Sequence, residues 1–212
     1  MRIIGGKFRG RRLECPKLVT RPTLDRVREA LFSILGDLSG LCVVDLYAGS
    51  GALGLEALSR GARHVTLVEA DRGAAQVIRK NVAGWGVERE LRVLESSVER
   101  ARAALGSIPP IDLVLADPPW KMAQEAALQV ARAVRGLLAP GARLVLGHPA
   151  RERLALDEAS GLVVVSCRSW GDSALSFLAV APASTADEKL DAAPEREIPE
   201  SDKAAGARPS AQ

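Results

Sequence analysis

Three short segments of this chain combine acidic side chains with glycine, proline or tryptophan at spacings that suit small-ligand chemistry. They are residues 45–54 (DLYAGSGALG), 68–71 (VEAD) and 117–120 (DPPW). A carboxylate can hold a cationic or hydroxyl-bearing ligand, and glycines let the backbone approach that ligand closely. Tryptophan offers a face on which a planar ring can stack. Together the segments predict one ligand site assembled from three separate places in the sequence.

The first segment is a glycine-rich turn with an acidic residue in front of it. Gly49, Gly51 and Gly54 match the GxGxxG pattern of dinucleotide sites, although a bare match is weak evidence. Asp45 separates the two interpretations, because a carboxylate four residues before Gly49 would repel the pyrophosphate of a dinucleotide. The same carboxylate would favour a cofactor with positive groups, such as the sulfonium and ammonium of S-adenosylmethionine. The turn therefore favours S-adenosylmethionine.

The second segment places an acid at the end of an expected strand. Glu69 follows Gly49 by 20 residues, where a carboxylate can accept hydrogen bonds from both ribose hydroxyls of an adenosine cofactor. This acid serves either cofactor class and does not discriminate between them. The alternative is that Glu69 and Asp71 only cap a helix, which suits Asp71 better than Glu69.

The third segment predicts a site for an amino group. Pro118 and Pro119 hold an extended turn at the end of an expected strand, beside Asp117. An amino group conjugated to a base is a poor nucleophile, and a carboxylate with a backbone carbonyl could orient it and stabilise the charge that develops on nitrogen. Trp120 could stack on the base. The alternative is a rigid turn with an exposed tryptophan.

Short β-branched runs alternate with helical stretches through most of the chain. Strands are expected at 41–46, 64–69, 91–95, 111–116, 142–147, 162–167 and 174–180. Helices are expected at 52–60, 73–85, 98–105 and 124–138, after a first helix that Thr23 caps and that ends near Gly36. This alternation predicts an α/β fold, a doubly wound, seven-stranded and mostly parallel sheet.

The last two expected strands differ from the others. Only a short turn around Gly171 and Asp172 separates them, which is too short for a crossover and predicts a terminal antiparallel hairpin at one edge. The three chemical segments follow the first, second and fourth strands. Ligands in such sheets bind beyond the carboxyl ends of the strands, so we expect the segments to meet there.

Composition excludes several classes of protein. The chain has 212 residues, of which 47% are hydrophobic and 26% charged, as in a globular domain. No stretch approaches the 18 or so apolar residues of a membrane span, and the start does not resemble a secretory signal. Cys15, Cys42 and Cys167 are widely spaced and accompany only two histidines. We therefore expect no disulfide scaffold and no metal site, and a cytoplasmic location.

Charge is distributed unevenly along the chain. Residues 1–28 carry nine Lys or Arg against Glu14 and Asp25, a net charge of +7. Such a basic segment on a near-neutral body favours contact with phosphates, and a solvated basic segment is the alternative. For Arg26 and Arg28 individually, a solvated helix face is nearly as good an interpretation. The expected RNA-binding residues are Arg2, Lys7, Arg9, Arg11, Arg12, Arg21, Arg26 and Arg28.

The last 30 residues have a different composition from the rest. Residues 183–212 carry seven acidic and four basic side chains, with no aromatic residue. Such a segment buries too little surface to offset its ordering entropy, which predicts a disordered acidic tail. The expected organisation is a basic RNA-binding arm at 1–22, an S-adenosylmethionine-dependent domain at 23–182, and the tail.

These motifs resemble a known family. DxYxGSG, VEAD and DPPW together are similar to class I S-adenosylmethionine-dependent methyltransferases, of Rossmann-like fold, that act on exocyclic amino groups of nucleic acids. Four longer segments restrict the resemblance to one family within this class. They are residues 2–13 (RIIGGKFRGRRL), 20–32 (TRPTLDRVREALF), 49–61 (GSGALGLEALSRG) and 171–177 (GDSALSF). Together these segments resemble the bacterial RsmD family of 16S rRNA (guanine-N2)-methyltransferases over residues 1–180.

The resemblance implies methylation of the guanine conventionally numbered 966 in 16S rRNA of the small ribosomal subunit. Carried over by position, the cofactor-binding residues would be Asp45, Tyr47, Gly49, Ser50, Gly51, Glu69 and Ser97, and the base would be held by Asp117, Pro118, Pro119 and Trp120. Two positions depart from the family pattern. Ser97 follows the third strand where many relatives have Asp or Asn, and Trp120 stands where relatives often have Phe or Tyr.

The expected mechanism is a direct in-line transfer of the methyl group, with no metal and no covalent enzyme intermediate. The three cysteines lie outside the DPPW segment, so a cysteine nucleophile is not expected there. Two alternatives remain open at this point. One is an adenine-N6 amino methyltransferase with the same DPPW segment, and the other is a non-catalytic rRNA-binding protein of the same fold. We expect the protein to be a monomer.

Overall fold

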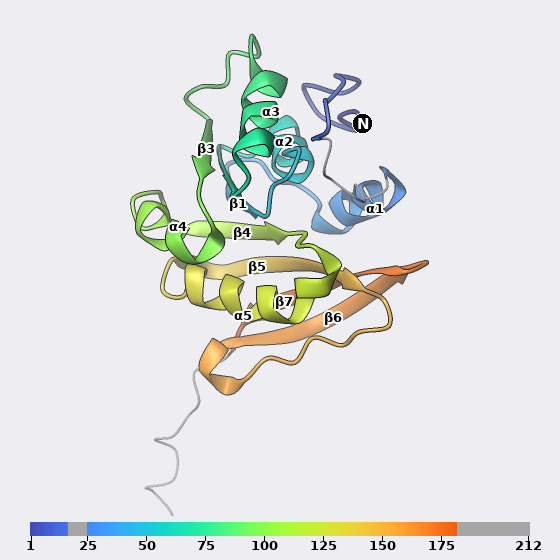
Figure 1. Ribbon diagram of the computed structural model, residues 1–212, viewed down its shortest axis with the longest axis vertical. Coiled ribbons are helices and arrows are strands. Elements are labelled where there is room, and N and C mark those ends of the chain that lie inside the picture. Colours follow the sequence, from blue (N-terminus) through green and yellow to red (C-terminus); the bar gives the residue numbers. More distant parts are fainter. Residues whose placement is uncertain (17–24, 182–212) are drawn as a thin grey trace, which may run out of the picture. The chain divides into compact units, whose positions relative to one another are not determined.

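The computed structural model describes residues 1–16 and 25–181, and the residues from Met1 to Ala181 form one compact unit (Figure 1). The expected cap Thr23, the expected RNA contact Arg21 and the expected tail at 183–212 lie outside the described residues. Within the described part of the chain, no helix is both long and apolar enough to cross a membrane.

The centre of the fold is a seven-stranded sheet in the order β3-β2-β1-β4-β5-β7-β6. Its strands are β1 (Cys42–Leu46), β2 (His64–Glu69), β3 (Leu91–Glu95), β4 (Ile111–Ala116), β5 (Leu138–Pro149), β6 (Leu162–Trp170) and β7 (Ser173–Val180). The first five strands are parallel, whereas β7 is antiparallel to both β5 and β6. This arrangement confirms the predicted doubly wound sheet with a terminal hairpin.

Helices cover both faces of this sheet. They are α1 (Asp25–Leu35), α2 (Ala52–Ser59), α3 (Arg72–Val82), α4 (Val98–Leu105) and α5 (Ala123–Val134). Successive strand side chains point to opposite faces, so Val43 packs in the core that includes α1, α2 and α3, whereas Val44 and Leu46 pack in the core with α4 and α5. Burial on both faces explains why β1 is apolar except for Asp45.

Two expected helices are too long at their carboxyl ends. The helix α5 ends at Val134, and β5 already begins at Leu138 beside Ile111 of β4, whereas the sequence predicted a helix to 138 and a strand from 142. Gly136 has a φ of +72°, a left-handed conformation that ends a helix readily. In the same way α3 ends at Val82, before Gly84 with a φ of +74°.

The first sixteen residues pack onto the body of the protein. Ile3, Phe8 and Leu13 are buried in the core that contains α2, so this segment is part of the compact unit. Glu56 of α2 accepts hydrogen bonds from the backbone N–H groups of Ile4 at 2.7 Å and Gly5 at 2.8 Å. The basic residues of this segment are therefore carried on a folded support.

The C-terminal half of α2 is the surface on which this segment turns. The backbone N–H of Phe8 donates to Ser59 Oγ at 2.9 Å, and the N–H of Lys7 donates to the Ser59 carbonyl at 2.7 Å. Gly6 lies so close to that carbonyl that a Cβ at this position would overlap it. Any side chain at Gly6 would displace the segment from α2, so the turn requires glycine there.

Candidate active site

The side chain of Asp45 holds the turn that follows β1. The side chain of Asp45 is 1% exposed, and its Oδ2 accepts a hydrogen bond at 2.8 Å from the backbone N–H of Gly54 in the first turn of α2. Gly51 has a φ of +79° and caps this helix, as the predicted tight turn requires. Asp45 thus orients the turn that carries Gly49 and Gly51.

Asp45 lies in a region of negative electrostatic potential. Burial, together with the charges of Asp117 and Glu69, raises the pKa of Asp45 to about 8, even though the hydrogen bond from Gly54 lowers it. Among the described groups that shift this pKa, both charged ones are carboxylates. A cation placed at this turn would therefore be stabilised.

Glu69 connects the turn to the next helix. One carboxylate oxygen of Glu69 accepts the backbone N–H of Gly49 at 2.7 Å, and the other accepts that of Asp71 at 2.7 Å. Asp71 in turn caps α3 by accepting the N–H of Ala74 at 2.7 Å, in agreement with the alternative interpretation of this acid as a helix cap. Each oxygen of Glu69 has a second lone pair that can accept a further hydrogen bond.

Tyr47, two residues after Asp45, adopts a strained backbone conformation. Its φ is +60°, and among the described non-glycine residues it alone has a positive φ. The Tyr47 hydroxyl donates a hydrogen bond to the side-chain oxygen of Gln129 on α5, and burial raises the pKa of Tyr47 to about 12. This contact joins the turn after β1 to the helix that follows the DPPW segment.

The DPPW segment begins where β4 ends, next to β1. Leu46 of β1 pairs with Ala116 of β4, so Asp117 directly follows the paired residues. Asp117 is half-buried, and Trp120 is half-buried at the start of a 3₁₀ turn, η1 (Trp120–Met122), that leads into α5. The carboxyl ends of β1 and β4 thus bring two of the predicted segments together.

Gly147 on β5 provides the space for the Asp117 carboxylate. A Cβ built on Gly147 would overlap Asp117 Oδ1, so a side chain at this position and the present Asp117 conformation exclude each other. Gly147 is buried and lies in the paired part of β5, opposite Leu175 of β7. This residue was not predicted from the sequence; a glycine inside an expected strand was the available signal, since it often marks a close approach.

Ser50 and Ser97 make contacts other than those expected for a cofactor. The Ser50 hydroxyl lies 4.0 Å from the Met1 sulfur, and Ser50 is buried. Ser97 precedes α4 as its N-terminal cap residue, and its Oγ accepts a 3.3 Å hydrogen bond from Arg100 Nε. The cofactor contacts expected of both serines remain predictions.

Arg28 corrects one expectation. Its side chain is fully buried, where its Nη2 donates to Asp25 at 2.9 Å and to the Arg2 carbonyl at 2.5 Å, and its Nε lies 4.0 Å from buried Glu56. Phosphate contact through Arg28 was predicted from its place in a basic run, and this is wrong because the guanidinium is not accessible. The exposed side chains Arg2, Lys7, Arg9, Arg11, Arg12 and Arg26 remain predicted contacts.

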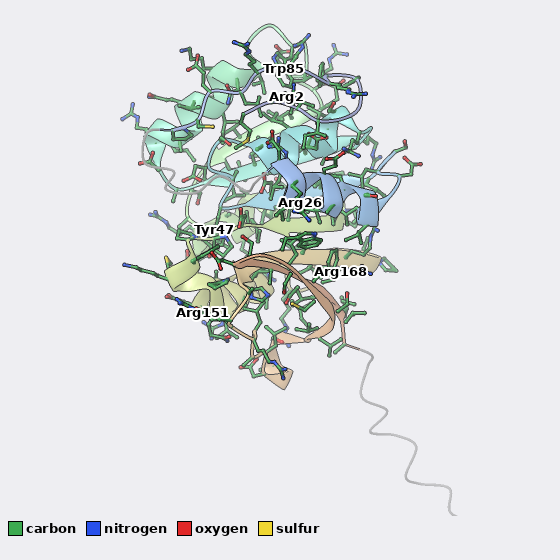
Figure 2. The ribbon with its side chains drawn as sticks, turned by 90° about the vertical axis from the view of Figure 1, so that its right-hand side faces the viewer. Arg2, Arg26, Tyr47, Trp85, Arg151 and Arg168 are labelled. Atoms are coloured by element: carbon green, nitrogen blue, oxygen red, sulfur yellow. The ribbon has the colours of Figure 1, made fainter. Side chains whose placement is uncertain are left out.

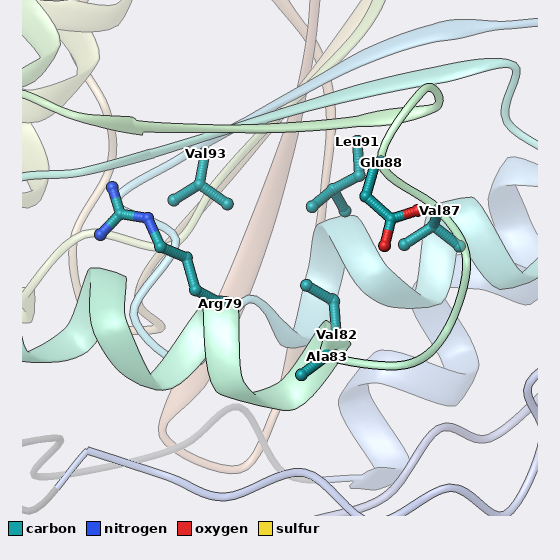
Figure 3. Close-up of a pocket in the computed structure, with 7 residues that line it drawn as sticks. All are labelled: Arg79, Val82, Ala83, Val87, Glu88, Leu91 and Val93. Atoms are coloured by element: carbon teal, nitrogen blue, oxygen red, sulfur yellow. The ribbon is translucent and has the colours of Figure 1, made fainter.

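A pocket of about 310 Å³ lies away from these segments (Figure 3). It opens between the carboxyl-terminal half of α3 and β3, and its lining residues are Arg79, Val82, Ala83, Val87, Glu88, Leu91 and Val93. None of the predicted site residues lines it. We therefore place the candidate active site at the strand ends, not in this pocket.

The sheet order defines a Rossmann-like fold, and the protein belongs to the structural class in which methyltransferases have this fold. A putative methyltransferase from Escherichia coli is 32% identical, with a TM-score of 0.70 over 86% of this chain and 98% of that chain. A protein of Thermus thermophilus is also 32% identical, with a TM-score of 0.71 over 86% of this chain and 99% of that chain.

The family model described as conserved hypothetical protein 95 matches residues 1–179. The chain belongs to this family, the RsmD family of methyltransferases, which confirms the resemblance read from the motifs.

Curated relatives match over a shorter region. Ribosomal RNA small subunit methyltransferase D of Escherichia coli K12 is 45% identical over 124 residues, which are 57% of this chain and 61% of that protein. A putative rRNA methyltransferase of Bacillus subtilis is 38% identical over 124 residues, 57% of this chain and 67% of that protein. The chain therefore spans about three fifths of the length of the first of these relatives.

Proposed function

We propose that this protein transfers a methyl group from S-adenosylmethionine to an exocyclic amino group in small-subunit rRNA, namely N2 of the guanine numbered 966. Membership of the RsmD family and the relatives named as small-subunit rRNA methyltransferases support this substrate. The observation that carries the proposal is the Asp117 carboxylate, held against Gly147 at the end of β4 and close enough to Asp45 to raise its pKa.

The residues at the strand ends fit a cationic, ribose-bearing cofactor. The carboxylates of Glu69 and Asp117 create negative potential around Asp45 at the turn after β1, and a sulfonium with an ammonium would relieve it and favour the ionised form of Asp45. A pyrophosphate would instead add to this repulsion. When bound, S-adenosylmethionine supplies an electrophilic methyl group. In this proposal Glu69 holds the ribose hydroxyls through its remaining lone pairs, and the turn of Gly49 and Gly51 lets the backbone lie against the cofactor.

The amino group of the target base would be held by the DPPW turn. The Asp117 carboxylate accepts one amino hydrogen, which orients the nitrogen and stabilises the positive charge that develops on it. The adjoining proline-rich turn holds the carboxylate in place, so little reorganisation accompanies the reaction. Trp120 supplies a stacking face for a base that has left its helix, since its ring is half-buried at the start of η1.

The first experiment measures the product. Nucleosides from 16S rRNA of a strain lacking the gene are compared with those of the complemented strain by mass spectrometry. We expect N2-methylguanosine to be lost at position 966 and restored by the wild-type gene. Loss of N6-methyladenosine instead would mean that the base is adenine, and an unchanged nucleoside profile would favour a non-catalytic rRNA-binding protein.

The second experiment tests the role of Asp117. Single-turnover methylation is measured on small subunits from the deletion strain, with the enzyme saturated in cofactor. Asp117→Asn retains one carbonyl acceptor and removes the charge, so the rate should fall about a hundred- to a thousandfold. Cofactor affinity measured by calorimetry should persist. A near wild-type rate would show that the amino group is held elsewhere.

A further inference from the structure

A cluster of aromatic and basic side chains lies at the far end of α2 from the candidate active site. Phe8 and Trp85 pack with their ring centroids 4.6 Å apart and their planes tilted by 42°. The Arg11 guanidinium carbon lies 4.8 Å from both ring centroids, and Lys7 Nζ lies 4.9 Å from that of Phe8. We call Lys7, Phe8, Arg11 and Trp85 the aromatic–cation cluster.

Trp85 belongs to a loop that the sequence pattern did not connect with the basic segment. It lies between α3 and β3, flanked by Gly84 and Gly86, whose φ angles are +74° and +68°. The left-handed conformations on both sides turn the chain so that the indole packs on Phe8. Figure 2 shows Trp85 above the N-terminal segment, with Tyr47 farther down the molecule in this view.

The cluster holds two positive charges that no described carboxylate neutralises. Lys7 and Arg11 are exposed, and neither is in an ion pair within residues 1–16 and 25–181. A guanidinium stacked on aromatic faces keeps its N–H edge available. Because the free protein already restricts its rotamers, the guanidinium loses little further conformational entropy when it binds a ligand. Such an arginine suits bidentate contact with a phosphate.

The length of α2 sets the distance between this cluster and the turn after β1. Ser50, beside Met1, lies just before α2, and Ser59, beside Phe8, is its last residue. The eight residues of α2 span about 12 Å at 1.5 Å per residue. A ligand that contacts both the turn after β1 and the aromatic–cation cluster must therefore extend well beyond one nucleotide.

We propose that Trp85 is a positioning residue for RNA, which with Phe8 holds Arg11 and Lys7 against a backbone phosphate remote from the methylated base. This inference rests on the proposed function and deepens it by assigning the enzyme an extended RNA footprint. Trp85 itself acts through Arg11, because Phe8 and the guanidinium occupy its surroundings.

The test is a double-mutant cycle measured as affinity for small subunits that lack the modification. Trp85→Ala should weaken binding about two- to fivefold, the range expected for an exposed cation–π contact. Arg11→Ala should weaken binding further and lower the log–log salt slope by about 0.7–0.9. Trp85→Ala should have little additional effect in the Arg11→Ala background, because the two residues act as one unit.

Matched variants separate this role from folding. Trp85→Phe keeps a ring on Phe8 and should restore most of the affinity. Arg132→Ala removes an exposed arginine of α5, on the opposite face of the sheet, and should leave affinity and salt slope unchanged. Cofactor affinity and the single-turnover rate at saturating subunits should be close to wild type for all variants.

Two results would overturn the inference. One is wild-type affinity in Trp85→Ala, and the other is an equal loss from Trp85→Ala with and without Arg11. Failure of the proposed function has a different signature, because the wild-type protein would then bind the subunits without methylating the guanine. The affinity comparison between variants would still report on Trp85. A wild-type protein that binds no subunits would overturn this inference as well.

Discussion

Gly147 of β5 lies against the carboxylate of Asp117, with no space for a side chain between them. The contact joins two strands whose neighbouring positions are paired, Ala116 with Leu146. A residue without chemistry of its own thereby determines where the acid at the end of β4 can lie. The Asp117 position proposed for the amino group thus depends on a strand in which the sequence analysis had identified no site residue.

Gly147→Ala should slow methyl transfer without weakening cofactor binding. The added Cβ must displace the Asp117 carboxylate, and a misplacement of about 1 Å can lower a rate up to about a hundredfold. The measurement is single-turnover methylation, with calorimetry for the cofactor. Gly106→Ala is the control, because a Cβ there meets its nearest atom at an ordinary 3.5 Å. Equal rates for the two variants would contradict the prediction.

Trp120→Ala should weaken capture of the target base. Base–aromatic stacking contributes about 1–3 kcal/mol, so subunit affinity should fall between about fivefold and a hundredfold or more. Trp120→Phe preserves a stacking face and should recover most of the loss. Affinity is measured with cofactor bound and with subunits lacking the modification. If Trp120→Phe were as impaired as Trp120→Ala, the indole would be serving a purpose other than stacking.

The stability of the free protein should depend on pH through Asp45. Burial raises the pKa of Asp45 to about 8, compared with about 4 in an unfolded chain. The folded state therefore binds an extra proton between these values, so stability should fall as the pH rises from about 4 to about 8. The slope is at most about 1.4 kcal/mol per pH unit.

Asp45→Asn should flatten this dependence, because the amide keeps an acceptor for the Gly54 N–H and carries no charge. Urea unfolding from about pH 5 to about pH 9 measures the slope. The control is Asp37→Asn. Hydrogen bonds from Ser39 lower the pKa of this exposed acid, so Asp37 stays ionised over that pH range and does not contribute to the slope of stability against pH. Parallel profiles for wild type and Asp45→Asn would contradict the prediction.

Arg28→Met should destabilise the fold. The substitution removes the cation beside Asp25 and the buried Glu56, and breaking a buried pair typically costs about 3–5 kcal/mol. Arg26→Met, at an exposed position of the same helix, should change the unfolding free energy by no more than about 0.5 kcal/mol. Urea unfolding compares the two. Equal unfolding free energies for the two variants would show that the Arg28 guanidinium does not stabilise the fold through Asp25 and Glu56.

Much of the fold was predictable because local patterns encode it. The expected strands at 64–69, 91–95 and 111–116 agree with β2, β3 and β4, since each is a short apolar run ended by acid, glycine or proline. The order in which such elements alternate predicts parallel pairing. The boundaries of α5 and β5 were not predictable in this way, because pairing of Leu138 with Ile111, 27 positions earlier, extends the strand.

The sequence by itself determined the order in which strands and helices follow one another along the chain, the glycine-rich turn, and the acids at the strand ends. Spacing and residue type within a few positions suffice for these features. Only the tertiary structure decided which basic residues are accessible. Arg28 and Arg11 have the same charge and lie in the same basic run, yet one is buried beside Glu56 and the other rests on Phe8 and Trp85. The difference arises from contacts between residues far apart in the chain, which no local pattern records.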